Sequence, residues 1–272
     1  MLKVCEVTKH YAEAGSRSQI CCAVDGISTE FRENTVYSLV GESGSGKSTL
    51  ARILAFVEKP TGGDIEIDGK SVFAYGKREL RAKRVDIQLV MQDGLSSLDP
   101  RQKVEEILAE PLKDLMGMDK NQCAKRIREL ARLVGLPEEL LRQRPKTLSG
   151  GQQKRVCIAR AISVNPRLII FDESLSGLDV TLRKRIMDLL INLKEELKCS
   201  YLFITHDIEV AMYLSQVILV MKNGQIVERV ENVQGYGDFS HSYSKSLINA
   251  LMMKRSALQH ISCGPAAQKS IC

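Results

Sequence analysis

A glycine-rich segment that ends in lysine, serine and threonine has the clearest chemistry in this sequence. Residues 41–49 read Gly-Glu-Ser-Gly-Ser-Gly-Lys-Ser-Thr and fit the phosphate-loop pattern G-x-x-x-x-G-K-S. Glycines let backbone N–H groups approach phosphate oxygens, the lysine reaches the β- and γ-phosphates, and the serine hydroxyl can ligate Mg²⁺. The pattern predicts a nucleotide site formed by Gly41, Ser43, Gly44, Gly46, Lys47, Ser48 and Thr49.

The segments on either side of this loop fit the same prediction. Residues 35–40 are apolar and β-branched, as in a buried strand, and apolar residues recur at helical spacing over 50–57. A glycine-rich turn without a ligand is the alternative interpretation. False matches of this kind usually lack the strand or the helix, so the order strand, loop, helix favours a nucleotide.

A pair of carboxylates follows a second apolar run. Residues 168–171 are all apolar and lead directly into Asp172 and Glu173. At the end of a strand beside a phosphate loop, Asp172 would hold Mg²⁺ and Glu173 would polarise an attacking water. Acidic residues at strand ends are common in α/β proteins, so the pair gains its meaning from Lys47.

Three further residues have chemistry that the spacing alone leaves open. Ser149 begins a helix that runs to about residue 161, where it suits either a bound phosphate or a plain helix cap. Tyr11 suits either core packing or stacking on an adenine ring. His206 follows the strand 200–204, at the edge where open α/β sheets bind ligands, which favours a role near the γ-phosphate.

The remaining pattern predicts the elements that position these residues. Alternation over 2–7, 20–40 and 64–69 predicts an antiparallel β layer beside the nucleotide, and 85–91 predicts another strand. From 101 to 144 apolar residues recur at helical spacing, with Pro111, Gly117 and Pro137 separating the helices of an insertion.

Towards the C-terminus, helices and strands alternate. We expect helices over 180–197 and 207–214, strands over 216–221 and 225–230, an amphipathic helix over 241–253, and disorder in the last fifteen or so residues.

The composition is that of a globular, intracellular protein. The 272 residues contain no apolar run of membrane-spanning length, and the first residues resemble a strand rather than a signal peptide. The eight cysteines include one adjacent pair, Cys21 and Cys22, and no C-x-x-C, so neither a zinc site nor a disulfide framework is indicated. The net charge of +6 is modest and spread along the chain, which favours a solvated surface over nucleic-acid binding.

Taken together, these residues resemble the nucleotide-binding subunit of an ABC transporter, nearly throughout the chain up to about residue 253. Six motifs match in order. Residues 41–49 match Walker A, Gln92 the Q-loop, 148–152 the LSGGQ signature, 169–172 Walker B with Glu173 as the following carboxylate, 176–179 the D-loop, and His206 the switch histidine.

The resemblance implies a fold and a set of roles. The fold would be α/β: a P-loop NTPase core with an antiparallel β subdomain and a helical subdomain inserted at about 95–160. The ATPase domain would span 1–235, and the C-terminal helix and tail 236–272. ATP and Mg²⁺ would be the cofactors. The resemblance also makes Lys47, Gln92, Glu173 and His206 catalytic, adds Gln92 to the metal ligands Ser48 and Asp172, places Tyr11 on the adenine, and adds Ser149, Gly151, Gln152 and Asp179 to the nucleotide contacts.

In this family two such subunits face head to tail, and each ATP lies between one Walker A and the other subunit's signature loop. The segments 41–52, 92–101 and 241–247 resemble the ATPases of peptide and nickel importers. The implied partners are a second ATPase, identical or different, two transmembrane permease subunits and, indirectly, an extracytoplasmic solute-binding protein. The subunit would lie peripherally at the cytoplasmic face of the membrane.

A soluble ABC-type ATPase acting on nucleic acid or ribosomes is the alternative. The interval between Lys47 and Ser149 is too short for the long coiled coil of the DNA-repair members, and translation factors usually carry two cassettes in one chain. A P-loop kinase or GTPase would not explain the LSGGQ loop. The sequence departs from the family at Ser174-Leu175, where Pro-Thr is usual, and its tail cysteines Cys263 and Cys272 are too few to predict an iron–sulfur site.

Overall fold

A computed structural model describes residues 2–12, 20–91 and 97–262, with side chains described up to residue 253. A six-stranded sheet forms its centre, in the order β10-β9-β3-β8-β7-β6. Neighbouring strands run parallel except β10, which pairs antiparallel with β9. The strands are β3 (Val36–Val40), β6 (Ile87–Val90), β7 (Leu168–Asp172), β8 (Ser200–Thr205), β9 (Val217–Lys222) and β10 (Gln225–Glu231).

A second, four-stranded antiparallel sheet lies beside it, in the order β2-β1-β4-β5. Its strands are β1 (Leu2–Ala12), β2 (Ile20–Phe31), β4 (Gly62–Ile67) and β5 (Lys70–Ser71). The prediction that residues 20–40 belong to this layer was wrong in part: β2 lies in it, but β3 belongs to the central sheet. The five residues of β3 are all buried, as expected of a strand covered on both faces.

Eight α-helices complete the described chain: α1 (Lys47–Leu54), α2 (Lys77–Lys83), α3 (Val104–Asp114), α4 (Lys120–Leu133), α5 (Gly150–Ile162), α6 (Val180–Leu197), α7 (Ile208–Leu214) and α8 (Ser242–Ser262). Four short 3₁₀ turns join them: η1 (Val72–Ala74), η2 (Glu138–Arg142), η3 (Pro145–Thr147) and η4 (Tyr236–Asp238).

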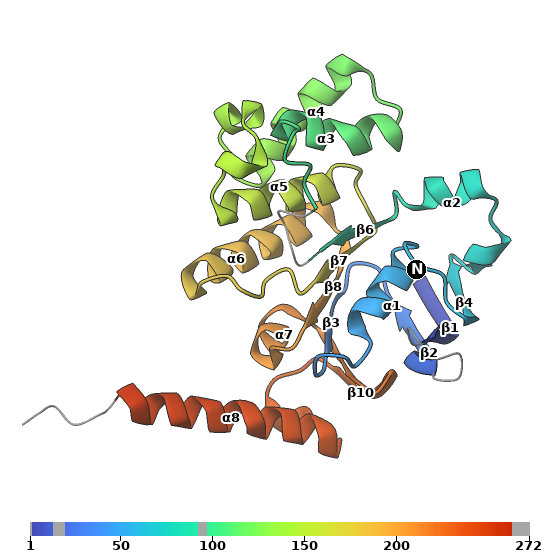
Figure 1. Ribbon diagram of the computed structural model, residues 1–272, viewed down its shortest axis with the longest axis vertical. Coiled ribbons are helices and arrows are strands. Elements are labelled where there is room, and N and C mark those ends of the chain that lie inside the picture. Colours follow the sequence, from blue (N-terminus) through green and yellow to red (C-terminus); the bar gives the residue numbers. More distant parts are fainter. Residues whose placement is uncertain (1, 13–19, 92–96, 263–272) are drawn as a thin grey trace, which may run out of the picture.

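The two faces of the central sheet carry different layers. Tyr201 and Phe203 pack with α3, α4, α5 and α6, whereas Leu202 and Ile204, which alternate with them along β8, pack with α1 and the antiparallel sheet. Figure 1 shows the same division, with α3 to α6 on one side of the strands and α1, β1, β2 and β4 on the other.

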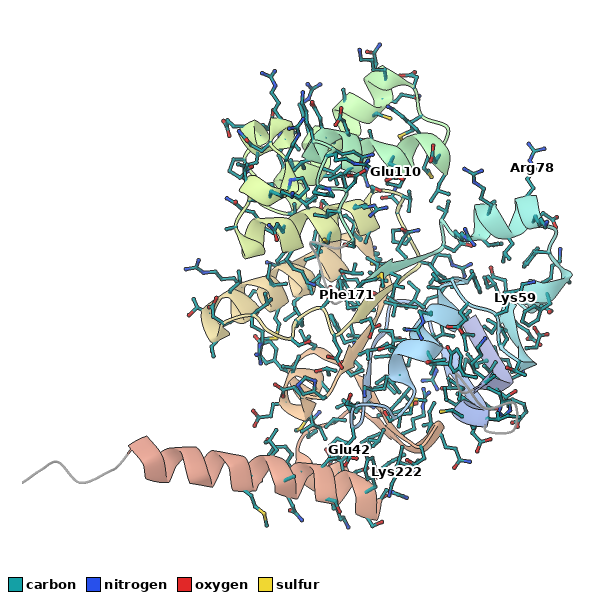
Figure 2. The ribbon with its side chains drawn as sticks, in the orientation of Figure 1. Glu42, Lys59, Arg78, Glu110, Phe171 and Lys222 are labelled. Atoms are coloured by element: carbon teal, nitrogen blue, oxygen red, sulfur yellow. The ribbon has the colours of Figure 1, made fainter. Side chains whose placement is uncertain are left out.

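Aromatic rings fill the core on the helical face. The ring of Phe171, labelled in Figure 2, stacks on that of Phe203 with centroids 4.8 Å apart and meets Tyr201 edge-on at 5.2 Å. Both contacts have the geometry that aromatic quadrupoles prefer. Because Phe171 immediately precedes the predicted metal ligand, this packing holds the end of β7 in place.

Two predictions about helix boundaries were wrong. Pro111 does not separate helices but lies buried inside α3, so that tertiary packing outweighs the intrinsic cost of an interior proline. The C-terminal helix does not stop at 253 but continues to Ser262, which includes residues predicted to be disordered. Residues 263–272, with both tail cysteines, lie outside the described part of the chain, and the limits of the helical subdomain remain a prediction.

Candidate nucleotide-binding site

The predicted phosphate loop is held between two backbone segments that leave no room for side chains. A Cβ at Gly46, whose φ is +102°, would collide with the carbonyl oxygen of Ala23, and one at Gly41 would collide with that of Met221. The loop is also tied to the turn after β9, where the Gly224 N–H donates to the Ser45 carbonyl at 3.0 Å. The loop leads directly into α1, which begins at Lys47. The first backbone N–H groups of a helix lack partners within the helix, so they are available to a bound phosphate.

The side chain of Lys47 lies inside this loop. Its Nζ donates hydrogen bonds to the carbonyls of Gly41 at 2.9 Å and Glu42 at 2.6 Å, and to the Ser45 hydroxyl at 3.2 Å. Burial lowers the pKa of the ammonium group, against the opposing charges of nearby carboxylates. All of its present partners are oxygen acceptors, as phosphate oxygens are.

Two of the three predicted metal ligands meet although they are far apart in sequence. The Ser48 hydroxyl, at the start of α1, donates to Asp172 Oδ1, at the end of β7, at 2.9 Å. Burial raises the pKa of Asp172, and the charge of Glu173 adds to this while the Ser48 hydrogen bond opposes it. Within the described residues no group of three or more His, Cys, Asp or Glu side chains could hold a metal. A hydroxyl and one carboxylate fit Mg²⁺, which is usually bound by one or two carboxylates together with substrate phosphates.

Glu173 has an uncommon backbone conformation. Its φ is +43°, in the left-handed region that residues other than glycine seldom adopt. Its N–H donates to the Ile204 carbonyl at 3.0 Å, and its own carbonyl accepts from the Ser176 hydroxyl. Strain of this kind persists where surrounding contacts fix the backbone, and it concentrates at functional sites.

The predicted histidine lies beside this carboxylate. His206 follows β8, its Nδ1 is 3.8 Å from Glu173 Oε2, and its side chain is 59% exposed. The carboxyl ends of β7 and β8 thus bring Asp172, Glu173 and His206 to the edge of the sheet next to Ser48. That is where ligands of open α/β sheets bind. Gln92, the remaining predicted catalytic residue, lies outside the described residues.

The signature segment forms a helix cap and is not joined to this chain's own phosphate loop. The Ser149 hydroxyl accepts from the Gln152 N–H, while the Gln152 side chain accepts from the Ser149 N–H at 2.9 Å, so the two form a capping box for α5. Among the described residues, no hydrogen bond or ion pair links this segment to the loop around Lys47. The signature segment and the phosphate loop lead into helices on opposite faces of the central sheet, since α5 and α1 pack in different hydrophobic cores.

The helix that follows the D-loop packs on the signature segment. Asp179 caps α6 by accepting from the Leu182 N–H at 2.9 Å. Leu182 in turn lies so close to Gly151 that a Cβ there would be 2.7 Å from Leu182 Cδ1. Leu182 thus connects Asp179 to the signature segment, although the sequence separates the two motifs.

Tyr11 lies in a polar cluster whose other members the sequence did not reveal. Its hydroxyl donates to Glu58 Oε1 at 2.6 Å, and Glu58 also pairs with Lys9 at 3.0 Å and with Arg52 at 3.1 Å. Burial by itself would raise the pKa of Glu58, but hydrogen bonds from Tyr11, Lys9 and Arg52 outweigh it and lower the pKa to about 2. Only the fold brings β1 to the end of α1, so no local pattern could have identified Glu58. The stacking role of Tyr11 remains a prediction.

The fold and the site together define the class of P-loop nucleotide-binding proteins: a phosphate loop opens α1, and a pair of carboxylates ends β7 of the same sheet. Comparison with known proteins narrows this class. The sequence profile of the family described as ABC transporter matches residues 24–176. The nickel import ATP-binding protein NikE of Escherichia coli O157:H7 is 38% identical over 257 residues, covering 93% of this chain and 94% of its own length.

Further relatives also belong to ABC-type transport systems. The oligopeptide transport ATP-binding protein OppD of Mycobacterium tuberculosis is 41% identical over 229 residues, 84% of this chain and 37% of that longer protein. The cassette MJ0796, solved as a dimer in a post-hydrolysis state with ADP and Pi, superposes with a TM-score of 0.76 at 32% identity, over 86% of this chain and 100% of that one. The cbiO1 protein of Clostridium perfringens, part of the transporter complex cbiONQ, gives 0.75 at 27% identity, over 95% and 98%.

This chain belongs to the ABC transporter family. It is an ATP-binding and ATP-hydrolysing subunit of the ABC type, as the resemblance in the sequence predicted. No helix in the described part of the chain combines the length and the apolar character needed to cross a bilayer.

Proposed function

We propose that this chain powers the import of a peptide, nickel or another metal chelate by hydrolysing ATP bound at the site around Lys47. The observation that carries the hydrolysis is the 2.9 Å contact between Ser48 and Asp172, which joins the phosphate loop to a carboxylate-bearing strand end with Glu173 beside it. The names of the relatives support the cargo, since they are a nickel import protein and an oligopeptide transport protein.

In this proposal the loop residues bind the triphosphate. Lys47 exchanges its carbonyl and hydroxyl partners for β- and γ-phosphate oxygens, and the N–H groups at the start of α1 bind the same anion. Ser48 and Asp172 would hold Mg²⁺, with Gln92 as a further ligand. The metal, when bound, neutralises charge on the β- and γ-phosphates.

Glu173 acts on the attacking water. Its carboxylate accepts a proton from the water whose oxygen bonds to the γ-phosphorus, while the bond from that phosphorus to the β–γ bridging oxygen breaks and ADP leaves. His206, 3.8 Å from Oε2, keeps the carboxylate oriented and contacts the γ-phosphoryl group. The contacts that fix the Glu173 backbone support this role, because general bases need a defined position.

The second half of the site comes from a partner subunit. We place Ser149, Gly151 and Gln152 on the γ-phosphate of ATP bound by the partner's phosphate loop, with Asp179 at the same interface. The separation of α5 from α1 by the central sheet supports this arrangement, because one chain alone does not bring its two motifs together. The MJ0796 cassette is likewise dimeric.

The remaining partners follow from the importer class. We propose a peripheral position at the cytoplasmic face of a membrane, two transmembrane permease subunits that contact the ATPase pair, and an extracytoplasmic solute-binding protein that delivers the cargo.

The decisive experiment compares the wild-type chain with Glu173→Gln, with and without the candidate permease and ATPase partners, in MgATP. We expect partner-stimulated turnover in the wild type, a loss of about 100-fold or more in the variant, and retained ATP-driven pairing. Full activity of the isolated chain, insensitivity to Glu173, or stimulation by DNA or ribosomes would overturn the importer proposal.

A further inference from the structure

The C-terminal helix reaches the phosphate loop through one tyrosine. Tyr243 lies in the first turn of α8, beyond the residues matched by the family profile, and is 7% exposed. The N–H of Glu42, the second residue of the loop, donates a hydrogen bond to the Tyr243 hydroxyl at 3.2 Å. In Figure 2 Glu42 and Lys222 are labelled side by side above the first turns of α8.

The tyrosine ring is fixed from several directions. Lys222 Nζ, at the end of β9, lies 4.6 Å from the ring centroid, a cation–π contact. The ring also belongs to an apolar cluster with Val40, Val220 and Phe239. Val40 is the last residue of β3, directly before the loop, so the same cluster supports both the tyrosine and the strand that leads into the phosphate loop.

The start of α8 is anchored to the central sheet. Glu228 Oε1, on β10, accepts hydrogen bonds from the Ser240 N–H at 2.6 Å, the Ser240 hydroxyl at 2.8 Å and the His241 N–H at 3.0 Å. Burial alone would raise the pKa of Glu228, but the nearby Ser244 hydroxyl and the hydrogen bonds from His241 and Ser240 outweigh it and bring the pKa to about 2. An ionised carboxylate at a helix N-terminus is stabilising, so the first turn of α8 has a fixed position relative to the sheet.

Both backbone groups of Glu42 make hydrogen bonds: its N–H donates to the Tyr243 hydroxyl, and its carbonyl accepts from Lys47 Nζ at 2.6 Å. We propose that Tyr243 is a positioning residue for the phosphate loop. Its hydroxyl holds Glu42 so that the loop keeps the shape that binds ATP, and α8 thereby controls nucleotide affinity from outside the core of the cassette. This inference rests on the proposed nucleotide site.

The test is Tyr243→Phe, which keeps the ring and its packing and removes the hydroxyl. Because one hydrogen bond to the loop is lost, we expect the dissociation constant and KM for MgATP to rise about 3- to 10-fold while kcat changes by less than about twofold. Amide exchange at Glu42 should accelerate relative to Leu219 in β9. Neither the KM-against-kcat split nor local exchange at Glu42 would follow from a general loss of stability.

The matched control is Tyr236→Phe. Tyr236 belongs to the same apolar layer, but its hydroxyl donates to Glu209 on α7 at 2.8 Å rather than to the loop. We expect its MgATP affinity to equal that of the wild type. Equal weakening in both tyrosine variants, or unchanged affinity in Tyr243→Phe, would overturn the inference.

Lys47→Ala in the same titration separates this inference from the proposed site. Loss of MgATP binding in Lys47→Ala together with unchanged binding in Tyr243→Phe would leave the site in place and reject the role of Tyr243. Unchanged binding in Lys47→Ala would reject the site itself, and the inference with it.

Discussion

At the scale of single residues, the backbone of Glu173 combines strain with a proposed role in hydrolysis. A φ of +43° costs an L-residue with a Cβ roughly 1–2 kcal/mol. Glycine avoids this cost. The strain persists because hydrogen bonds to Ile204 and Ser176 fix the peptide groups on either side.

Two substitutions of Glu173 measure this strain. Both Glu173→Ala and Glu173→Gly remove the carboxylate, so both should be inactive in hydrolysis. We expect the glycine variant to have a free energy of unfolding about 1 kcal/mol higher than the alanine variant, measured by urea denaturation. Differences in nucleotide affinity do not enter, because the comparison is made without ATP. An alanine variant as stable as the glycine variant would show that the backbone is not strained.

Glu58 should make stability depend on pH in the acid range. Its pKa is lowered from 4.5 to about 2, so its contribution is fully present above pH 4.5 and is lost as the pH falls through about 2. We expect Glu58→Gln to be roughly 1–2 kcal/mol less stable than the wild type at pH 6, allowing for partial solvent exposure, with a difference that shrinks in acid.

Urea midpoints between pH 6 and pH 3 would test this expectation. Glu30→Gln serves as the control, because it makes the same change of charge on β2, the strand that pairs with β1. A difference between Glu58→Gln and the wild type that stays constant over this range would contradict the assignment.

At the scale of elements, the start of α5 combines a structural and a proposed functional role in one side chain. Ser149 caps the helix in a capping box with Gln152, and we also place it on the partner's γ-phosphate. Aspartate caps helices as well as serine does, but its negative charge would repel a phosphate. The two roles can therefore be separated.

We expect Ser149→Ala to lower the free energy of unfolding by about 1 kcal/mol and Ser149→Asp to leave it nearly unchanged. Both should lose ATP-driven pairing in the Glu173→Gln background, measured by size-exclusion chromatography with the second copy or the ATPase partner. Normal pairing of Ser149→Asp would mean that Ser149 only caps the helix.

At the scale of the whole molecule, the central sheet separates the two halves of the proposed site. Lys47 lies with α1 on one face, and Ser149 begins α5 on the other. In the proposed function, an ATP bound at Lys47 is therefore completed by the signature surface of another subunit. Two copies related by a two-fold axis would form two such composite sites.

A mixing experiment tests this arrangement. Lys47→Ala lacks a working phosphate loop and Ser149→Asp lacks a working signature, so each alone should be inactive. In a mixture, the loop of one variant meets the intact signature of the other, and we expect roughly a quarter of wild-type ATPase activity. With a different ATPase as partner, the second change is made in that subunit. No recovery in either arrangement would contradict a site shared between subunits.

The sequence by itself determined the residues that carry the proposed chemistry and the order of the elements. Phosphate loops, buried strands and capping segments can be predicted from contiguous residues, because each depends on local backbone geometry or local periodicity. The positions of the two helix boundaries that were predicted wrongly, at Pro111 and at residue 253, depend instead on packing.

Only the tertiary structure decided which distant residues meet. It brought Ser48 to Asp172 and His206 to Glu173, placed Glu58 on Tyr11, and joined Tyr243 to Glu42. These contacts cross between strands and helices far apart in the chain, so no local pattern contains them. It also separated Ser149 from Lys47, because the direction in which successive residues of a strand point assigns each helix to one face of the sheet.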